Sequence, residues 1–172
     1  MERNVILIGM PASGKSTLGE LLANELGMPF LDTDDLIRQR EGRSLQTLLD
    51  QEGMERFLQL EEAAVLSLHT QHTVVATGGS VVYSRRAMEH LKSQGICVYL
   101  QLSLAAIQQR LQDLDTRGVA IAQGQSLEEL YQARVPLYEA WADYTFPLPP
   151  GLSSPRHHAI RLARNLTQGI AP

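Results

Sequence analysis

The hydrophobic residues of this chain gather in short runs, and longer segments with a helical spacing of apolar positions separate them. Five runs have the composition and length of β-strands, at 4–9, 29–34, 73–78, 96–102 and 144–148. Helical patterns are expected at about 15–25, 54–70, 84–93, 103–112, 126–141 and 156–168. Three of the strand runs are apolar on both faces, which is typical of a parallel sheet covered by helices. The alternation predicts an α/β fold, with a five-stranded parallel sheet flanked by helices in three α/β/α layers.

The composition is that of an ordinary globular domain. The chain has 172 residues, 44% of them hydrophobic, and a formal net charge of -4 with acidic and basic residues interspersed. No basic surface for nucleic acid is indicated, and no apolar run reaches the length of a membrane span or a secretion signal. The lone Cys97 cannot form an internal disulfide. We therefore expect one domain over residues 1–172, cytoplasmic and monomeric, whose partners are small molecules rather than nucleic acid or membrane.

A phosphate-binding loop follows the first predicted strand. Gly9, Gly14, Lys15 and Ser16 match the pattern G-x-x-x-x-G-K-[ST], between an apolar strand and a helical pattern. In such a loop the backbone N–H groups point at phosphate oxygens, the lysine reaches the β and γ phosphates, and the serine hydroxyl binds Mg²⁺. The loop predicts binding of a magnesium nucleotide. GTPases, ATPase motors and small-molecule kinases all share it, and the chain's size favours a small-molecule kinase.

Two aspartates end the second predicted strand, and two glycines follow the third. Asp32 and Asp34 lie at the carboxyl end of the sheet, beside the loop, and alternation along a strand would point them to opposite faces. One carboxylate can hold Mg²⁺ through water while the other accepts the proton of an acceptor hydroxyl; a solvated acidic strand end is the alternative. Gly78 and Gly79 allow the backbone to approach a ligand closely, although a plain tight turn fits equally well.

Several stretches together resemble the shikimate kinases, which are P-loop kinases of the nucleoside monophosphate kinase type. The matching stretches are GMPASGKST, LDTDDLI, EGRSLQTLLDQEG, ATGGSVV and ARVPLYEAWAD, and they extend over nearly the whole chain. The resemblance implies ATP-dependent phosphorylation of a hydroxyl, from shikimate to shikimate 3-phosphate, with ATP and Mg²⁺ as cofactors. It also implies a mobile lid at about 112–125 and a substrate-binding helical segment at about 35–62.

The resemblance implies roles for individual residues. Asp34 would contact the shikimate hydroxyls and assist proton removal, and Asp32 would support Mg²⁺. Arg117, in the lid, would close over the transferring phosphates, where negative charge accumulates in the transition state. Arg134 would contact the substrate carboxylate; on spacing alone a helix-surface arginine is the alternative. Arg110 and the 153–155 loop would flank the adenine.

These assignments give four sets of expected site residues. The catalytic set is Lys15, Asp34 and Arg117. The ATP-binding set is Gly9, Ala12, Ser13, Gly14, Lys15, Ser16, Thr17, Arg110, Arg117 and Pro155. The substrate-binding set is Asp34, Leu58, Gly78, Gly79 and Arg134, and the metal set is Ser16 and Asp32.

The sequence departs from the family pattern at the expected acceptor site. In shikimate kinases an arginine grips the substrate carboxylate where this chain has Leu58, and the last of three glycines is replaced by Ser80. Arg56 cannot take over the clamp, because two positions along a helix it points roughly 200° away. Glu61 would lack the arginine that a carboxylate there normally meets. The lid motif R-P-L has become RGVAI.

Three functions therefore stay open at the level of sequence. The first is a shikimate kinase whose carboxylate clamp rests on Arg134 and the glycine turn. The second is a kinase of another polyol or sugar acid. The third is a nucleotide-binding regulatory protein with little turnover, although the presence of Lys15, Asp34 and Arg117 argues against it.

Overall fold

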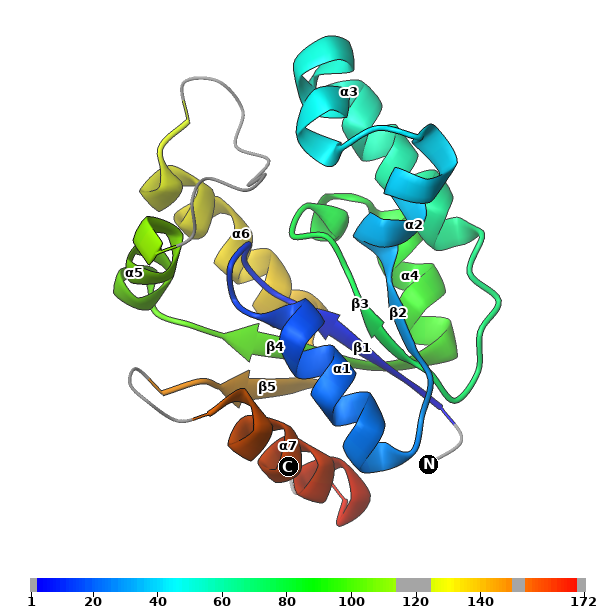
Figure 1. The fold of residues 1–172 in the computed structure, drawn as a ribbon, viewed down its shortest axis with the longest axis vertical. Helices are drawn as coiled ribbons and strands as arrows, with labels where there is room; N and C mark the ends of the chain where they lie inside the picture. The colour runs from blue at the N-terminus through cyan, green and yellow to red at the C-terminus, as the bar shows by residue number, and fades with distance from the viewer. Residues whose placement is uncertain (1–2, 114–124, 150–153, 170–172) are drawn as a thin grey trace.

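The computed structural model describes residues 3–113, 125–149 and 154–169, and its centre is a parallel β-sheet (Figure 1). The five strands are β1 (Asn4–Ile8), β2 (Phe30–Asp32), β3 (Val74–Ala76), β4 (Gly95–Gln101) and β5 (Tyr144–Pro147). Their order across the sheet is β2-β3-β1-β4-β5, and every neighbouring pair is parallel. All five strands lie where the sequence predicts them, to within two residues at either end. The predicted fold class is confirmed.

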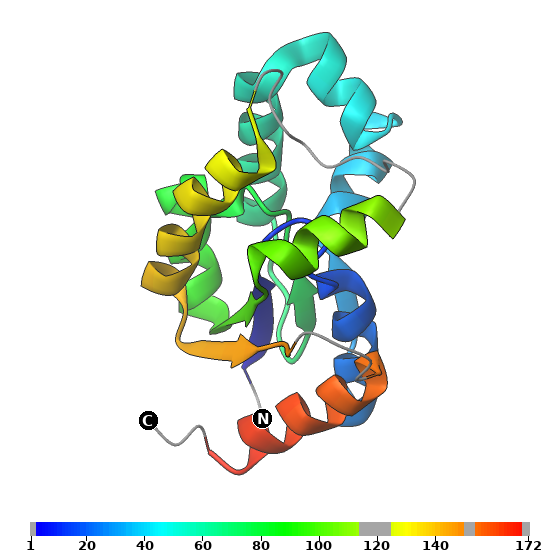
Figure 2. The same cartoon turned by 90° about the vertical axis from the view of Figure 1, so that its left-hand side faces the viewer.

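Helices cover both faces of the sheet. They are α1 (Lys15–Leu26), α2 (Thr33–Glu41), α3 (Leu45–Leu66), α4 (Arg85–Gln94), α5 (Leu104–Asp113), α6 (Leu127–Trp141) and α7 (Pro155–Thr167), with a 3-10 turn, η1 (Val81–Tyr83). Figure 2 shows α1 and α7 on one side of the sheet and α4 and α6 on the other. The molecule therefore has the expected three layers, with α2 and α3 standing above the carboxyl ends of β2 and β3.

The core explains why the strand runs are continuously apolar. The side chains of Val5, Leu7 and Ile8 on β1 are fully buried, because helices cover both faces of this central strand. Burying one such side chain stabilises the fold by about 1.5–3 kcal/mol. The core thus fixes the sheet, and with it the positions of the loops that leave its carboxyl edge.

Two helices differ from the prediction, because α2 was not predicted and α3 begins earlier than expected. No helical pattern in the sequence predicts α2, although its residues lie largely within the expected substrate-binding segment at 35–62. It begins because the Asp32 side chain accepts a hydrogen bond from the Asp34 N–H and so caps the helix. Helix α3 begins at Leu45, ahead of the predicted residue 54, and Gly53 (φ 81°, ψ 172°) interrupts it. The sequence prediction covers only the part after this glycine, where the helical pattern resumes.

The expected lid at 112–125 falls mostly outside the described residues, which resume at residue 125 after Asp113. Arg117 lies in this gap, and its predicted role stays a prediction. Within the described ranges, no helix has both the length and the apolar character needed to cross a membrane.

Candidate active site

The loop between β1 and α1 is built around the Lys15 ammonium group. Its Nζ donates hydrogen bonds to the carbonyl oxygens of Gly9 and Met10, both at 2.8 Å, and to the Ser13 hydroxyl at 3.3 Å. Gly14 has φ 89°, a conformation that favours glycine, and α1 begins directly after it. Burial lowers the pKa of Lys15 to about 8, although the Asp34 and Asp32 carboxylates oppose this effect. The amine therefore keeps its positive charge at neutral pH beside the N-terminus of α1.

Ser16 and Asp32 lie side by side at this helix end. The Ser16 hydroxyl donates to Oδ2 of Asp32 at 2.5 Å, while Oδ1 of Asp32 accepts from the Asp34 N–H at 2.8 Å. The expected alternation of the two aspartates along a strand is wrong, because β2 ends at Asp32 and Asp34 lies in the first turn of α2. The start of this helix, rather than strand pleating, separates their positions and gives them different partners.

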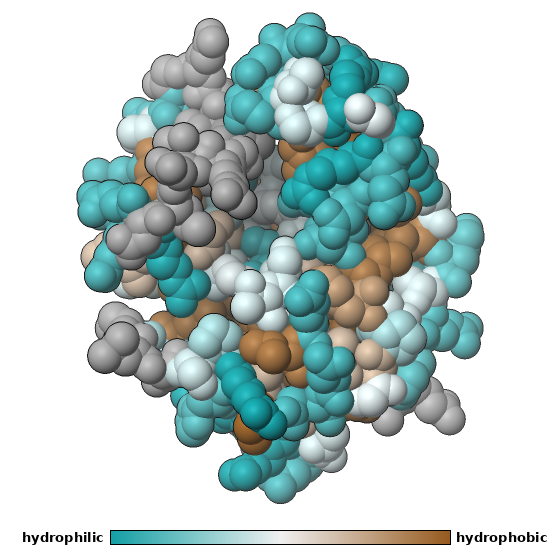
Figure 3. All heavy atoms as spheres, in the orientation of Figure 1, coloured by the Kyte–Doolittle hydropathy of each residue, from teal (hydrophilic) through white to brown (hydrophobic). Residues whose placement is uncertain are grey.

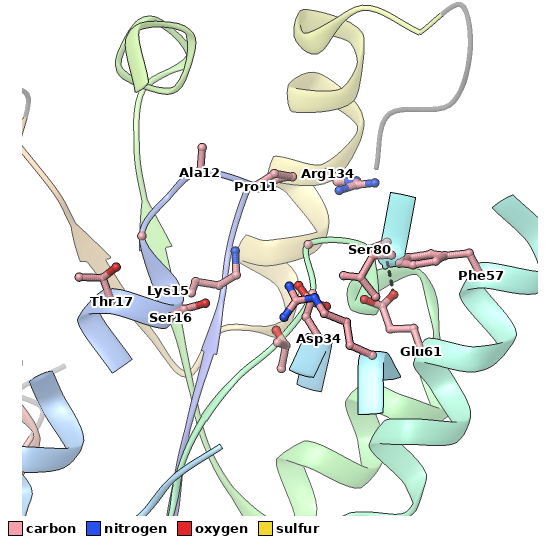
Figure 4. Close-up of a pocket in the computed structure, with 16 residues that line it drawn as sticks. Pro11, Ala12, Lys15, Ser16, Thr17, Asp34, Phe57, Glu61, Ser80 and Arg134 are labelled. Atoms are coloured by element: carbon pink, nitrogen blue, oxygen red, sulfur yellow. Dashed lines mark hydrogen bonds between the residues drawn. The ribbon is translucent and has the colours of Figure 1, made fainter. Parts of the chain in front are cut away.

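Most of the expected substrate and phosphate residues line one cavity of about 290 Å³ (Figure 4). The phosphate loop, α2, α3, α6 and the turn after β3 all contribute to its walls. The expected residues among its lining are Ala12, Gly14, Lys15, Ser16, Thr17, Asp34, Gly78, Gly79 and Arg134. The space-filling view in Figure 3 shows the surface hollowed between α1 and the α2–α3 segment. Segments far apart in the sequence thus converge on one site, which we call the acceptor cavity.

Asp34 faces this cavity with an oxygen that has no partner. Its Oδ1 atom is buried and makes no hydrogen bond among the described residues. Burial and the neighbouring Asp32 carboxylate raise the pKa of Asp34 to about 6, and the positive charges of Lys15 and Arg38 oppose that rise. A carboxylate with this pKa is ionised at neutral pH and is basic enough to accept a proton from a bound hydroxyl.

Glu61 and Ser80 form a second polar group in the same wall, and neither was among the expected site residues. Glu61 is 2% exposed, and its Oε2 accepts a hydrogen bond from the Ser80 hydroxyl at 2.7 Å, while its buried Oε1 has no partner in the described parts of the chain. Burial raises the pKa of Glu61 to about 7, against the lowering effect of the Ser80 hydrogen bond. A Cβ on Gly78 would clash with Oε1 of Glu61, so a larger residue there requires the buried Glu61 side chain to move.

This pair connects two departures from the family pattern. The sequence showed that Glu61 lacks its usual arginine and that a serine replaces a glycine at position 80. The structure shows that the Ser80 hydroxyl supplies Glu61 with the hydrogen bond. The serine that stands in place of a glycine at position 80 is the sequence signal, but its contact with Glu61 is visible only in the fold.

Arg134 enters the cavity from α6 and is held by aromatic residues. It is 2% exposed; its Nε donates to the Tyr83 hydroxyl at 3.4 Å, and its guanidinium carbon lies 5.3 Å from the centre of the Tyr83 ring. The Tyr138 hydroxyl donates to the Gly79 carbonyl at 2.6 Å, which ties α6 to the glycine turn. The alternative of a helix-surface arginine is excluded by this burial.

Leu58 does not line the acceptor cavity. It lines a separate cavity of about 460 Å³ between α3 and the η1–α4 region, whereas the α3 residues that line the acceptor cavity are Leu45, Phe57 and Glu61. Leu58 thus lines a neighbouring cavity, and its expected contact with the acceptor stays a prediction. Arg56 is exposed and pairs with Glu52 at 3.5 Å, which agrees with its expected orientation away from the site.

The expected adenine-side residues lie on the other side of the phosphate loop. Arg110 on α5 donates from Nη1 to the carbonyl oxygens of Ala12 at 3.2 Å and Ser13 at 2.9 Å. Arg110 and Pro155 line a cavity of about 170 Å³ that also contacts Thr17 and includes His158, a residue absent from the expected set. Residue 153 of the expected loop lies outside the described residues, whereas Pro155 begins α7.

Comparison with known proteins agrees with this architecture. The family model described as shikimate kinase matches residues 11–148. A shikimate kinase of Actinobacillus succinogenes is 42% identical over 85% of this chain and 86% of its own, and one of Mannheimia succiniciproducens is 38% identical over 85% and 86%. A solved shikimate kinase from Acinetobacter baumannii in complex with shikimate superimposes with a TM-score of 0.83 at 31% identity, covering 96% of this chain and 91% of the other. The chain belongs to the shikimate kinase family.

Proposed function

We propose that the protein transfers the γ-phosphoryl group of ATP to a hydroxyl of shikimate, giving shikimate 3-phosphate. The observation that carries this proposal is the acceptor cavity, in which Lys15, Asp34 and Arg134 line one space of about 290 Å³. Membership of the shikimate kinase family and the shikimate complex of the Acinetobacter baumannii relative support it. The cavity combines a cation for phosphate, a base for a hydroxyl and a cation for a carboxylate.

The phosphate loop would bind and orient the nucleotide. Backbone N–H groups at the start of α1 and the Lys15 ammonium group would hold the phosphates, and Arg110 and Pro155 would border the adenine side. When phosphate oxygens approach, they would replace the carbonyl oxygens that Lys15 now contacts. This exchange places the positive charge where negative charge develops during transfer.

Ser16 and Asp32 fit a Mg²⁺ ion that completes its coordination with phosphate and water. Their hydroxyl and carboxylate oxygens are 2.5 Å apart, and oxygen ligands of this kind suit a hard cation. No cluster of three or more His, Cys, Asp or Glu side chains that could hold a metal occurs among the described residues, in keeping with a Mg²⁺ site that relies on substrate phosphates. The ion would neutralise charge on the transferring phosphoryl group.

Asp34 would act as the base. Its unpartnered Oδ1 faces the cavity, and a pKa of about 6 leaves it ionised at neutral pH, so it can accept the proton as the hydroxyl attacks phosphorus. Arg134 would bind the acceptor carboxylate, and the Gly78–Gly79 turn would allow the acceptor ring close to the backbone. Arg117 is proposed, from the family resemblance, to stabilise charge on the transferring group.

The test is a coupled assay of ADP release with shikimate, together with mass measurement of the product. Wild-type protein is expected to release ADP in a shikimate-dependent way and to add one phosphoryl group to shikimate. Lys15→Ala is expected to reduce kcat by orders of magnitude, whereas Lys92→Ala, which removes a lysine paired with Asp143 outside the site, is the matched control. Absence of shikimate-dependent turnover, or full turnover by Lys15→Ala, would contradict the proposal.

A further inference from the structure

Arg38 is a basic residue of the acceptor cavity that the phosphate-loop and acceptor motifs do not include. It lies on α2 one turn after Asp34, and residues four positions apart share one face of a helix. Both side chains line the acceptor cavity together with Arg134. Arg38 therefore reaches the cavity from α2, on the same helix face as the base, whereas Arg134 reaches it from α6.

Few basic side chains of the acceptor cavity are available to bind an anionic acceptor. Three basic side chains among the described residues line it: Lys15, Arg38 and Arg134. Lys15 is committed to the phosphate loop, so Arg38 and Arg134 are the described cations that remain for an anionic acceptor. Helix α3 adds the acid Glu61 to the cavity and no cation, because the nearby Arg56 is exposed and pairs with Glu52.

The present partner of Arg38 is easily exchanged. Its guanidinium contacts the Asp35 carboxylate, and both side chains are about half exposed, at 48% and 59%. Ion pairs of this kind hold their side chains weakly, because water and salt screen them. A guanidinium has five N–H donors, so Arg38 can bind a second carboxylate while it keeps a contact with Asp35.

We propose that Arg38 is a carboxylate-binding residue of the acceptor site and, with Arg134, clamps the shikimate carboxylate from two sides. This inference rests on the proposed function and identifies the residue that replaces the missing arginine at position 58. The clamp has moved from α3 to α2, while Ser80 has taken over the hydrogen bond to Glu61. The site thereby keeps two guanidinium groups for one carboxylate.

A different role for Arg38 would leave a different experimental signature. Arg38 also lies close enough to Asp34 to lower the pKa of that carboxyl. A residue that acted only through Asp34 would change the pH profile of kcat and leave the affinity for a carboxylate unchanged. A clamp residue instead changes KM for shikimate and the discrimination between shikimate and its uncharged methyl ester.

The experiment compares wild type with Arg38→Ala and Arg38→Lys, and uses Arg40→Ala as the matched control. Arg40 is on the same helix and exposed, and its guanidinium donates a hydrogen bond to the Ser67 hydroxyl outside the cavity. Losing a charge-assisted hydrogen bond is expected to raise KM for shikimate about 10- to 100-fold in Arg38→Ala, with KM for ATP and the affinity for shikimate methyl ester within about twofold. Arg38→Lys should recover part of this loss, and Arg40→Ala should match wild type.

Direct calorimetric titration of shikimate keeps the two proposals separate. If wild type bound shikimate but did not phosphorylate it, the proposed function would be overturned. The clamp would then be tested by the Kd for shikimate of Arg38→Ala against that of wild type. A Kd or KM for shikimate that changes less than about twofold in Arg38→Ala would overturn the clamp. So would an equal loss of affinity for the methyl ester, or an effect confined to the pH profile of kcat.

Discussion

Replacing Glu61 by Gln should make the protein more stable at pH 8. Glu61 is 2% exposed, and burial raises the pKa of its carboxyl from 4.5 to about 7. The folded protein therefore binds the Glu61 proton more tightly than the unfolded chain does. The contribution of Glu61 to the free energy of unfolding is fully present below pH 4.5. It falls as the pH rises between 4.5 and about 7, and it then levels off.

The size of the effect follows from the two pKa values. Their difference corresponds to a loss of about 3 kcal/mol in the free energy of unfolding once Glu61 is ionised in both states. Glutamine has nearly the same shape, carries no charge, and can still accept the Ser80 hydroxyl through its carbonyl oxygen. Glu61→Gln should thus gain about 1–3 kcal/mol at pH 8 and nearly nothing at pH 4.5.

Urea denaturation at both pH values measures this difference directly. Glu62→Gln is the matched control, because Glu62 is adjacent but accepts hydrogen bonds from Ser84 and Arg86 at the protein surface. That variant should lose at most about 1 kcal/mol and gain nothing at pH 8. If Glu61→Gln were as stable as wild type or less stable at pH 8, the reasoning about a buried, uncompensated carboxyl would be refuted.

Other substitutions test neighbouring parts of the site. Asp34→Asn should keep the fold and lower kcat about 10²- to 10⁴-fold, and wild-type kcat should fall below about pH 6 as Asp34 is protonated; a flat pH profile would count against the base. Gly78→Ala, whose Cβ would lie 2.1 Å from Oε1 of Glu61, should cost about 1–3 kcal/mol in urea denaturation, and a neutral result would contradict the close packing. Leu58→Arg should lower KM for shikimate roughly tenfold, because Glu61 lines both cavities and can hold the new guanidinium at the acceptor; an unchanged KM would show that this side of α3 is not involved.

The sheet was predictable because its strands are apolar on both faces. Central strands such as β1 are wholly buried, so their sequence carries no helical periodicity that competes with the β pattern. Helix α2 was missed because it is largely polar, and only Thr33 and Ile37 are buried in it. Its start depends on a capping hydrogen bond that the Asp34 N–H donates to the Asp32 side chain, and an alternating strand pattern at LDTD conceals this helix start.

The site residues also fall into two groups, those that a local sequence pattern locates and those that only the fold brings together. The phosphate loop and the Asp32–Asp34 pair are local patterns, so the sequence locates them, and the fold brings the loop and Asp34 to one cavity with Arg134. The Ser80–Glu61 hydrogen bond joins residues 19 positions apart, and no periodicity links them. The position of Arg38 in the cavity depends on a helix that the sequence did not reveal, so this residue could be assigned only from the structure.

The central claim is that the acceptor is shikimate, and the most direct measurement is kcat/KM for wild-type protein with shikimate against a panel of sugar acids and neutral polyols. The cavity contains Arg134 and Arg38 for a carboxylate and Asp34 for a hydroxyl, so kcat/KM should be highest for shikimate by at least about tenfold. A neutral polyol or a sugar acid that matches or exceeds shikimate would contradict the account, as would ATP binding without turnover of any acceptor.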